Sequence, residues 1–162
     1  MKPRIYIASP LGFSEAGQYW YYNVLVPLVE RCGFEVVDPW KLTAPAIIKT
    51  AMFSPEGPEQ RRAWEAANKI IGENNERGIQ TSHLVLGLLD GPDVDSGTAS
   101  EIGFAAGINK PIEGYRNDFR LAGDNIGSRI NLQVEHWIRR MGGVISPDLK
   151  ALETVLQERK FI

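Results

Sequence analysis

The sequence has few of the residues on which metal centres, disulfide frameworks and membrane spans depend. It contains one cysteine, Cys32, and two histidines, His83 and His136, in 162 residues. A disulfide framework and an all-cysteine zinc site are therefore excluded, and little remains for a histidine-rich metal centre. No stretch approaches the ~20 apolar residues that a membrane-spanning helix requires. The first residues lead into a short apolar run rather than a secretory leader.

The sequence also lacks an excess of either charge. It has 18 Lys and Arg against 20 Asp and Glu, and its densest basic pairs are Arg61-Arg62 and Arg139-Arg140. Nucleic-acid binding requires a concentrated basic face, so no nucleic acid is expected as a partner. With 43% hydrophobic residues, the chain can bury one sizeable core. We therefore expect residues 1–162 to form a single soluble, cytoplasmic domain.

Several common nucleotide-binding and catalytic motifs are absent as well. There is no G-x-x-x-x-G-K-[ST] motif, and no G-x-G-x-x-G follows the first expected strand. A P-loop nucleotidase is therefore excluded, and a dinucleotide-dependent oxidoreductase is unsupported. The G-x-S-x-G elbow of serine hydrolases and the H-E-x-x-H helix of zinc proteases are also missing.

Short apolar segments rich in strand-forming residues alternate with helical patterns along the chain. The five expected strands are Arg4–Ala8, Phe34–Val37, His83–Leu89, Lys110–Tyr115 and Gly143–Ile145. The expected helices begin at Ser14 and Ser146 or span residues 46–53, 59–77, 98–107 and 131–140. The buried side of the long helix is marked by Trp64, Ala67, Ile70 and Ile71. This alternation predicts a parallel α/β sheet, in which ligands bind beyond the carboxyl ends of the strands.

The segment from Asp90 to Glu101 concentrates acidic and small residues at one such strand end. Two interpretations of its acids stay open. In the first, Thr98-x-x-Glu101 is a capping box, and Asp95-Ser96-Gly97 is a turn with aspartate at its first position. In the second, Glu101 is a nucleophilic carboxylate that the helix N-terminus keeps ionised at neutral pH. Gly97 is small enough to let a ligand approach that carboxylate.

Aromatic and amide side chains accompany the same expected crevice. Tyr6, in the first strand, is either an ordinary core tyrosine or a residue of the crevice. Phe13 and Trp40 follow the first two strands, in loops where they either stack on a planar ligand or pack against the loops themselves. Asn75 near the expected end of the long helix, and Asn131 before a later helix, also suit ordinary capping roles.

Taken together, these residues resemble the nucleoside 2-deoxyribosyltransferases. The resemblance rests on residues 78–87 (GIQTSHLVLG), residues 95–105 (DSGTASEIGFA), Ile5–Ala8 and Asn131-Leu132, which occur in the family's order. It implies a flavodoxin-like, or Rossmann-like, α/β fold: a parallel five-stranded sheet with helices on both faces. It also implies exchange of the base of a 2′-deoxynucleoside without a metal or other cofactor.

The resemblance assigns a role to each matching position. Glu101 falls on the family's nucleophile, Asp95 on the aspartate that contacts the base and helps to protonate it, and Tyr6 on the tyrosine that orients the nucleophile. Asn131 falls on the asparagine that reaches the sugar 5′-hydroxyl from a neighbouring subunit. A second family aspartate aligns with Asn75, whose amide can hold a base but cannot donate the proton of a carboxylic acid.

The implied mechanism has two displacements at C1′ of the deoxyribose. The carboxylate stabilises an oxocarbenium-like charge and traps the sugar as an ester. A second purine or pyrimidine base then attacks from the side that the first base left, which retains the β-configuration, and slow hydrolysis is a side reaction. Phe13 and Trp40 are the candidate walls that keep water out before the acceptor arrives.

Two other functions stay open. The related 2′-deoxynucleoside 5′-monophosphate N-glycosidases share the fold and the glutamate but bind a phosphate, for which residues 9–13 offer no arginine. A non-catalytic nucleotide-sensing module would use Glu101 only as a cap. The resemblance further implies a homo-oligomer, a dimer or hexamer, with shared active sites. An aromatic cluster at Tyr19–Tyr22 is expected to be exposed, and Phe161-Ile162 corresponds to a C-terminus that lies near a neighbour's site in the family.

Overall fold

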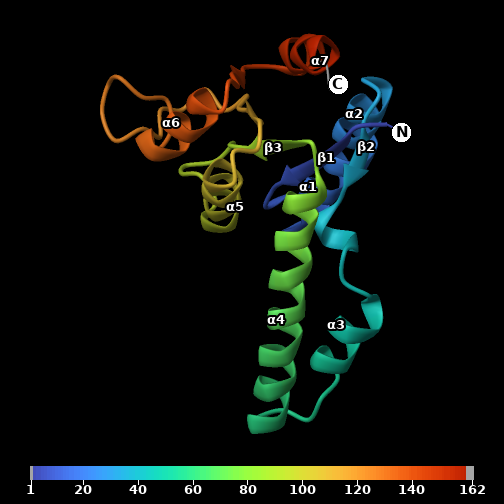
Figure 1. Ribbon diagram of the computed structural model, residues 1–162. Coiled ribbons are helices and arrows are strands. Elements are labelled where there is room, and N and C mark those ends of the chain that lie inside the picture. The colour runs from blue at the N-terminus through green and yellow to red at the C-terminus, as the bar shows by residue number, and fades with distance from the viewer. Residues whose placement is uncertain (1, 160–162) are drawn as a thin grey trace.

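The computed structural model describes residues 2–159, so Phe161 and Ile162 lie outside the described residues. Its centre is a parallel sheet in the order β2-β1-β3-β4-β5 (Figure 1). The strands are β1 (Arg4–Ala8), β2 (Glu35–Val37), β3 (Leu84–Leu88), β4 (Ile112–Tyr115) and β5 (Ile145–Ser146). All four neighbouring pairs are parallel. This is the flavodoxin-like order, and it confirms the predicted fold class.

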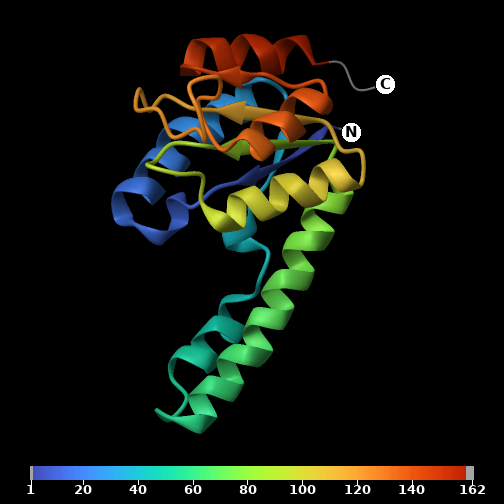
Figure 2. The same ribbon diagram turned by 90° about the vertical axis from the view of Figure 1, so that its left-hand side faces the viewer.

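Helices cover both faces of this sheet (Figure 2). One face carries α1 (Glu15–Trp20), α2 (Val26–Arg31) and α7 (Leu149–Glu158), and the other carries α4 (Pro58–Thr81), α5 (Ser96–Gly107) and α6 (Leu132–Arg140). Alternate side chains of β1 enter the two cores, with Ile5 and Ile7 on the first face and Tyr6 and Ala8 on the second. Among residues 2–159, none of the helices combines the length and apolar character of a membrane span.

A π-helical turn, Tyr21–Leu25, separates α1 from α2. Pro27 follows it, and proline has no N–H with which to bind the carbonyl four residues earlier, so the regular helical ladder is interrupted there. In this turn Tyr21 and Tyr22, although adjacent in sequence, donate hydrogen bonds to the same carboxylate, that of Asp38, at 3.2 and 3.0 Å. The turn therefore directs two hydroxyls toward the end of β2.

Helix α4 is longer than predicted and projects beyond the sheet, with α3 (Pro45–Met52) packed along it (Figures 1 and 2). The prediction ended this helix near Arg77, but it continues to Thr81. Gly78, just past the expected end, lies at a close approach instead: a Cβ there would lie 2.8 Å from the Leu42 side chain and 3.1 Å from the Tyr6 ring. The glycine allows close approach of helix and strand rather than ending the helix.

Two helices begin at residues other than those predicted. Asp95, not Thr98, is the N-cap of α5, and its carboxylate accepts a hydrogen bond from the Thr98 amide at 2.9 Å. Ser146 pairs with Tyr115 in the sheet, so Asp148 caps α7 instead. The capping-box interpretation of Glu101 is therefore wrong, because Glu101 lies in the second turn of α5, beyond the capping position.

Candidate active site

A cavity of about 690 Å³ lies at the carboxyl edge of the sheet, beside the N-terminus of α5 and the α3–α4 pair. Its lining includes a polar group of residues, here called the polar half, namely Asn75, Asp95, Gly97 and Glu101. It also includes an aromatic and apolar group, here called the aromatic half, namely Phe13, Trp40, Ile48, Trp64 and Ile71. The structure thus brings together six of the eight predicted site residues around one cavity.

Two hydrogen-bond donors contact one oxygen of the Glu101 carboxylate. The Tyr6 hydroxyl donates to Glu101 Oε1 at 2.6 Å, and the Asn75 amide donates to the same oxygen at 3.4 Å. No described residue donates to the other oxygen, Oε2. Since Glu101 lines the cavity, this arrangement orients the carboxylate and leaves Oε2 for a ligand.

The environment of Glu101 makes its carboxylate unusually basic. Burial raises the pKa of Glu101 to about 7, the hydrogen bond from Tyr6 lowers it, and the charge of Asp95 adds to the rise. At a pKa of about 7 the carboxylate is about half ionised at neutral pH, so burial outweighs the stabilisation expected from the helix N-terminus, whose effect is strongest within the first turn. Burial and the Glu101 charge also raise the pKa of Tyr6, which stays protonated and remains a donor.

Asp95 lies beside Glu101 on the cavity wall. Its Oδ2 accepts from the backbone amide of Thr98 at 2.9 Å and from the Thr98 hydroxyl at 3.2 Å. Its other oxygen, Oδ1, accepts no hydrogen bond from a described residue. A Cβ at Gly97 would lie 3.1 Å from the Asp95 carboxylate, so glycine keeps space around this group.

Asn75 lies within α4 rather than at its end, so its predicted capping alternative is wrong. Its amide nitrogen faces Glu101, whereas its carbonyl oxygen is buried and has no hydrogen-bond partner among the described residues. A buried acceptor without a partner is costly. Because this oxygen is buried, Asn75 acts on the site through the amide nitrogen that faces Glu101.

The aromatic half begins with two rings in short 3-10 turns, Leu11–Phe13 and Pro39–Lys41. The rings of Phe13 and Trp40 meet edge to face, with centroids 4.7 Å apart and planes at 84°. Asp38 positions the second ring, because its carboxylate accepts from the Trp40 amide at 3.1 Å. Phe13 and Trp40 therefore pack against each other and also line the cavity.

The family profile of the nucleoside 2-deoxyribosyltransferases matches residues 5–133. The match covers most of the chain and contains every site residue discussed above. The chain belongs to the nucleoside 2-deoxyribosyltransferase family. Among residues 2–159, no three or more His, Cys, Asp or Glu side chains are grouped so as to hold a metal ion.

Solved structures share the fold of this deoxyribosyltransferase-family chain. A conserved protein from Enterococcus faecalis V583 is 24% identical with a TM-score of 0.73, covering 99% of this chain and 100% of that chain. A 2-desoxiribosyltransferase from Leishmania mexicana is 20% identical (TM-score 0.67; 98% and 99% covered). A CMP N-glycosidase from Clostridium botulinum is 15% identical (TM-score 0.55; 94% and 97% covered). No curated protein matches the sequence.

The remaining predicted site residue of the family pattern, Asn131, does not line the cavity of its own chain. Its side chain caps α6 by accepting from the amides of Gln133 and Val134 at 3.1 and 3.3 Å. The connection that precedes it, residues 116–131, exposes several large apolar side chains, namely Phe119, Leu121 and Ile126. The structure therefore assigns Asn131 the helix-capping role, and its role toward a neighbouring site stays a prediction.

One wall of the site and one surface differ from what the sequence predicts. The sequence predicts Trp64 and Ile71 on the buried side of α4, but both are half-buried and line the cavity. The length of α4 is the feature that indicates this, because a helix of 24 residues extends beyond the sheet it covers. The predicted exposed cluster at residues 19–22 is wrong: Tyr19 is exposed, whereas Tyr21 is 1% exposed and belongs to the core.

Proposed function

We propose that this protein exchanges the nucleobase of 2′-deoxyribonucleosides through a covalent deoxyribosyl–Glu101 intermediate. The observation that carries the proposal is the arrangement of Glu101 in the cavity. One carboxylate oxygen accepts the Tyr6 hydrogen bond, the other accepts none from a described residue, and Glu101 lines a cavity of about 690 Å³ together with Asp95 and aromatic rings. Family membership supports the same class of reaction.

In the first half-reaction, Glu101 Oε2 attacks C1′ of the deoxyribose. The C1′–O bond forms while the glycosidic bond breaks, and the electron pair of that bond passes to the nitrogen of the departing base. Deoxyribose lacks the electron-withdrawing 2′-hydroxyl, so positive charge develops readily at C1′. Asp95 contacts the base and takes part in transferring the proton that this nitrogen requires.

In the second half-reaction, an incoming base attacks C1′ from the face that the first base left. The ester bond to Glu101 breaks, the carboxylate is regenerated, the proton that the attacking nitrogen loses returns to Asp95, and the β-configuration is retained. Water competes with the acceptor base and gives slow hydrolysis. The rings of Phe13 and Trp40 limit this competition, since a base stacked against them occupies the space through which water would approach C1′.

Asn75 adds a neutral group where the family's carboxylic acid is expected. Its amide nitrogen donates to Glu101, and its carbonyl oxygen is buried. We assign proton transfer to Asp95 and substrate binding to Asn75, because an amide has no acidic proton to give.

A second candidate is an N-glycosidase acting on nucleoside 5′-monophosphates, which the Clostridium botulinum neighbour favours. Such an enzyme must bind a phosphate. The cavity presents the two carboxylates of Asp95 and Glu101, and none of its described lining residues is Lys or Arg. Carboxylates repel a phosphate dianion, so the site suits an uncharged nucleoside better.

The proposed assembly is a homo-oligomer in which Asn131 reaches a neighbouring site. The connection before α6 supports it: Phe119 is 91% exposed and Leu121 is 75% exposed. Large exposed apolar side chains gathered on one segment are typical of a protein–protein interface. Light scattering at micromolar concentration tests the assembly, and the mass of one chain would contradict it.

The proposed chemistry is tested with deoxyinosine and free adenine as substrates. We expect hypoxanthine and deoxyadenosine on chromatography, and a deoxyribosyl adduct on Glu101 when the quenched protein is analysed by mass spectrometry. Glu101→Gln should lose at least about 10⁴-fold in rate, because the covalent step disappears. Glu30→Gln, at an exposed position on α2, is the matched control.

Two outcomes contradict the proposal. An adduct on a residue other than Glu101 rejects the assigned nucleophile. Hydrolysis of nucleoside 5′-monophosphates without any base exchange establishes the N-glycosidase instead.

A further inference from the structure

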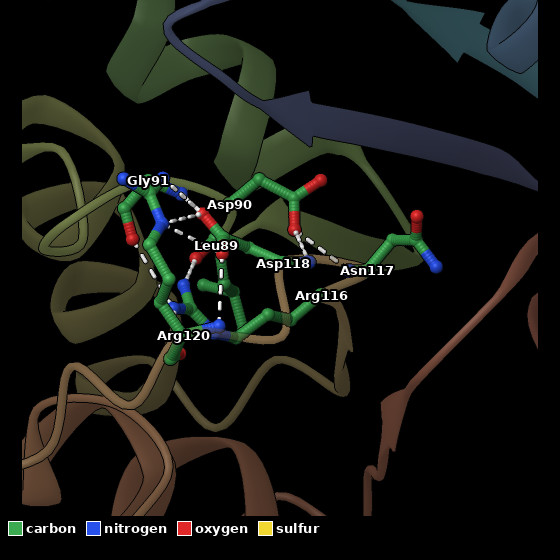
Figure 3. Close-up of polar contacts among 7 residues, drawn as sticks. All are labelled: Leu89, Asp90, Gly91, Arg116, Asn117, Asp118 and Arg120. Carbon is green, nitrogen blue, oxygen red and sulfur yellow. Dashed lines mark hydrogen bonds and ion pairs between the residues drawn. The ribbon is translucent and has the colours of Figure 1, made fainter.

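Arg116, the first residue after β4, is completely buried. Its guanidinium donates to the carbonyl oxygens of Leu89, of Gly91 at 3.1 Å and of Arg120 at 2.8 Å (Figure 3). Among residues 2–159, no carboxylate forms an ion pair with Arg116. A buried cation loses its hydration, so these three carbonyl oxygens are the groups that compensate it.

Hydrogen bonds to the Asp90 and Asp118 side chains also join the loop after β3 to the loop after β4. Asp90 accepts hydrogen bonds from the backbone amides of Asn117 and Asp118, both at 2.7 Å. Asp118 in turn accepts from the Gly91 amide at 3.2 Å (Figure 3). Both backbone polar groups of Gly91 are therefore bound by residues that follow β4. The loop after β3 and the loop after β4 form one connected polar network.

The loop after β3 leads directly to the cavity. Asp95 follows Gly91 by four residues, caps α5 and contributes to the polar half. Gly91 has a φ of 129°, a conformation that side-chain-bearing residues rarely adopt. Glycine restricts its own backbone least, so the hydrogen bonds with Arg116 and Asp118 help to determine the conformation at Gly91. A shift at Gly91 would be transmitted through this short segment to Asp95.

Stability alone does not require an arginine at this position. Replacing a buried charged group by a well-packed apolar side chain is often neutral or stabilising. An apolar side chain cannot bind three carbonyl oxygens, however, whereas the planar guanidinium has five donors in a fixed geometry. What arginine adds is a defined relative position of the two loops.

We propose that Arg116 is a positioning residue that holds the loop after β3 so that Asp95 meets the nucleobase. Arg116 does not line the cavity and contacts no reacting atom. Its effect on the reaction passes through Asp95. The inference rests on the proposed function, in which Asp95 contacts the base.

The test is a double-mutant cycle with Arg116→Met and Asp95→Asn, measuring kcat/KM for base exchange. Arg116→Met alone should lower kcat/KM by about tenfold to a hundredfold, because a small displacement of a positioned group has effects of this size. In the Asp95→Asn background the same substitution should change kcat/KM by less than about twofold, since residues that act through one another are not additive. An equal fall in both backgrounds overturns the proposal.

A second substrate separates positioning from a general loss of structure. An aryl 2-deoxyriboside with a nitrophenolate leaving group departs without a proton, so Arg116→Met should keep nearly the parent rate on it. A matching loss on this substrate means that Arg116 has only a structural role, and the proposal fails. Arg31→Met, at an exposed position on α2, is the matched control.

Asp90→Ala provides an independent variant if Arg116→Met does not fold. It removes the acceptor of two cross-loop hydrogen bonds at an exposed position, and the same dependence on Asp95 is expected. A loss that is independent of Asp95 overturns the proposal. If Asp95→Asn and Glu101→Gln exchange bases at the parent rate, the proposed function itself fails, whatever Arg116 does.

Discussion

The two halves of the cavity are held in place in different ways. The polar half is built on the core: Tyr6 is fully buried in β1 and donates to Glu101 on α5, a helix that packs against the sheet. The aromatic half is built on short turns and the projecting α3–α4 pair, where Phe13 is 78% exposed and Trp40 is 37% exposed. The comparison indicates that the proposed nucleophile is fixed by the fold, whereas the walls proposed to meet the base can vary without disturbing it.

The largest expected effect that sharpens this comparison comes from Tyr6→Phe. Loss of a buried donor to the reacting carboxylate should lower kcat/KM by about a hundredfold. Because the Tyr6 hydrogen bond lowers the pKa of Glu101, its removal should also shift the acid limb of the pH–rate profile to above about 7. In the proposed mechanism the ionised carboxylate is the nucleophile, so activity should be lost as pH falls through this pKa.

The measurement for Tyr6→Phe is the profile of kcat/KM between about pH 5 and pH 9. Tyr19→Phe, at an exposed position, should leave both the rate and the profile unchanged. If the pKa on the acid limb of the kcat/KM profile is the same in Tyr6→Phe as in the parent, the hydrogen bond from Tyr6 on β1 does not lower the pKa of Glu101.

A second prediction concerns the free energy of unfolding, which the buried Glu101 carboxylate lowers when it is ionised. The folded-state pKa of Glu101, about 7, is raised above its ordinary value, so the folded protein binds this proton more tightly than the unfolded chain. The corresponding stability is present at low pH and lost as pH rises through about 7. Glu101→Gln carries no charge at any pH, and it should be more stable than the parent by about 2 kcal/mol at pH 8.

Urea unfolding at pH 8 and pH 5 measures this difference, which should shrink toward pH 5, where the parent's Glu101 is protonated in the folded state. Glu30→Gln is the control, because its side chain is exposed. If Glu101→Gln is less stable than the parent at pH 8, burial of the ionised Glu101 carboxylate does not destabilise the folded protein.

The sequence predicts the polar half more completely than the aromatic half, and the reason is physical. Asp95 and Glu101 follow the most apolar strand, and strand ends of a parallel sheet converge at one edge, so their proximity to Tyr6 follows from the topology. Burial does not follow in the same way. The raised pKa of Glu101 depends on what covers it, and spacing along α5 contains no information about that cover.

The parts that escaped prediction depend on contacts between distant segments. A half-buried Trp64 gives the same helical periodicity whether it faces a core or a cavity. Arg116 belongs to a residue type that is almost never fully buried, so the sequence offers no reason to expect it in the interior. Its role becomes visible only when the loops after β3 and β4 lie side by side.

The smallest expected effect tests the aromatic half directly. In Trp40→Ala, the base loses a stacking surface that contributes about equally in the bound substrate and in the transition state, so KM should rise by about tenfold with little change in kcat. The share of hydrolysis among the products should also rise, because water gains access to the ester. Steady-state kinetics with and without acceptor base measure both quantities, and Phe53→Ala, at an exposed position that does not line the cavity, is the control. A fall in kcat as large as that of Tyr6→Phe would mean that Trp40 also positions the reacting atoms, and the division between a fixed polar half and a variable aromatic half would not hold.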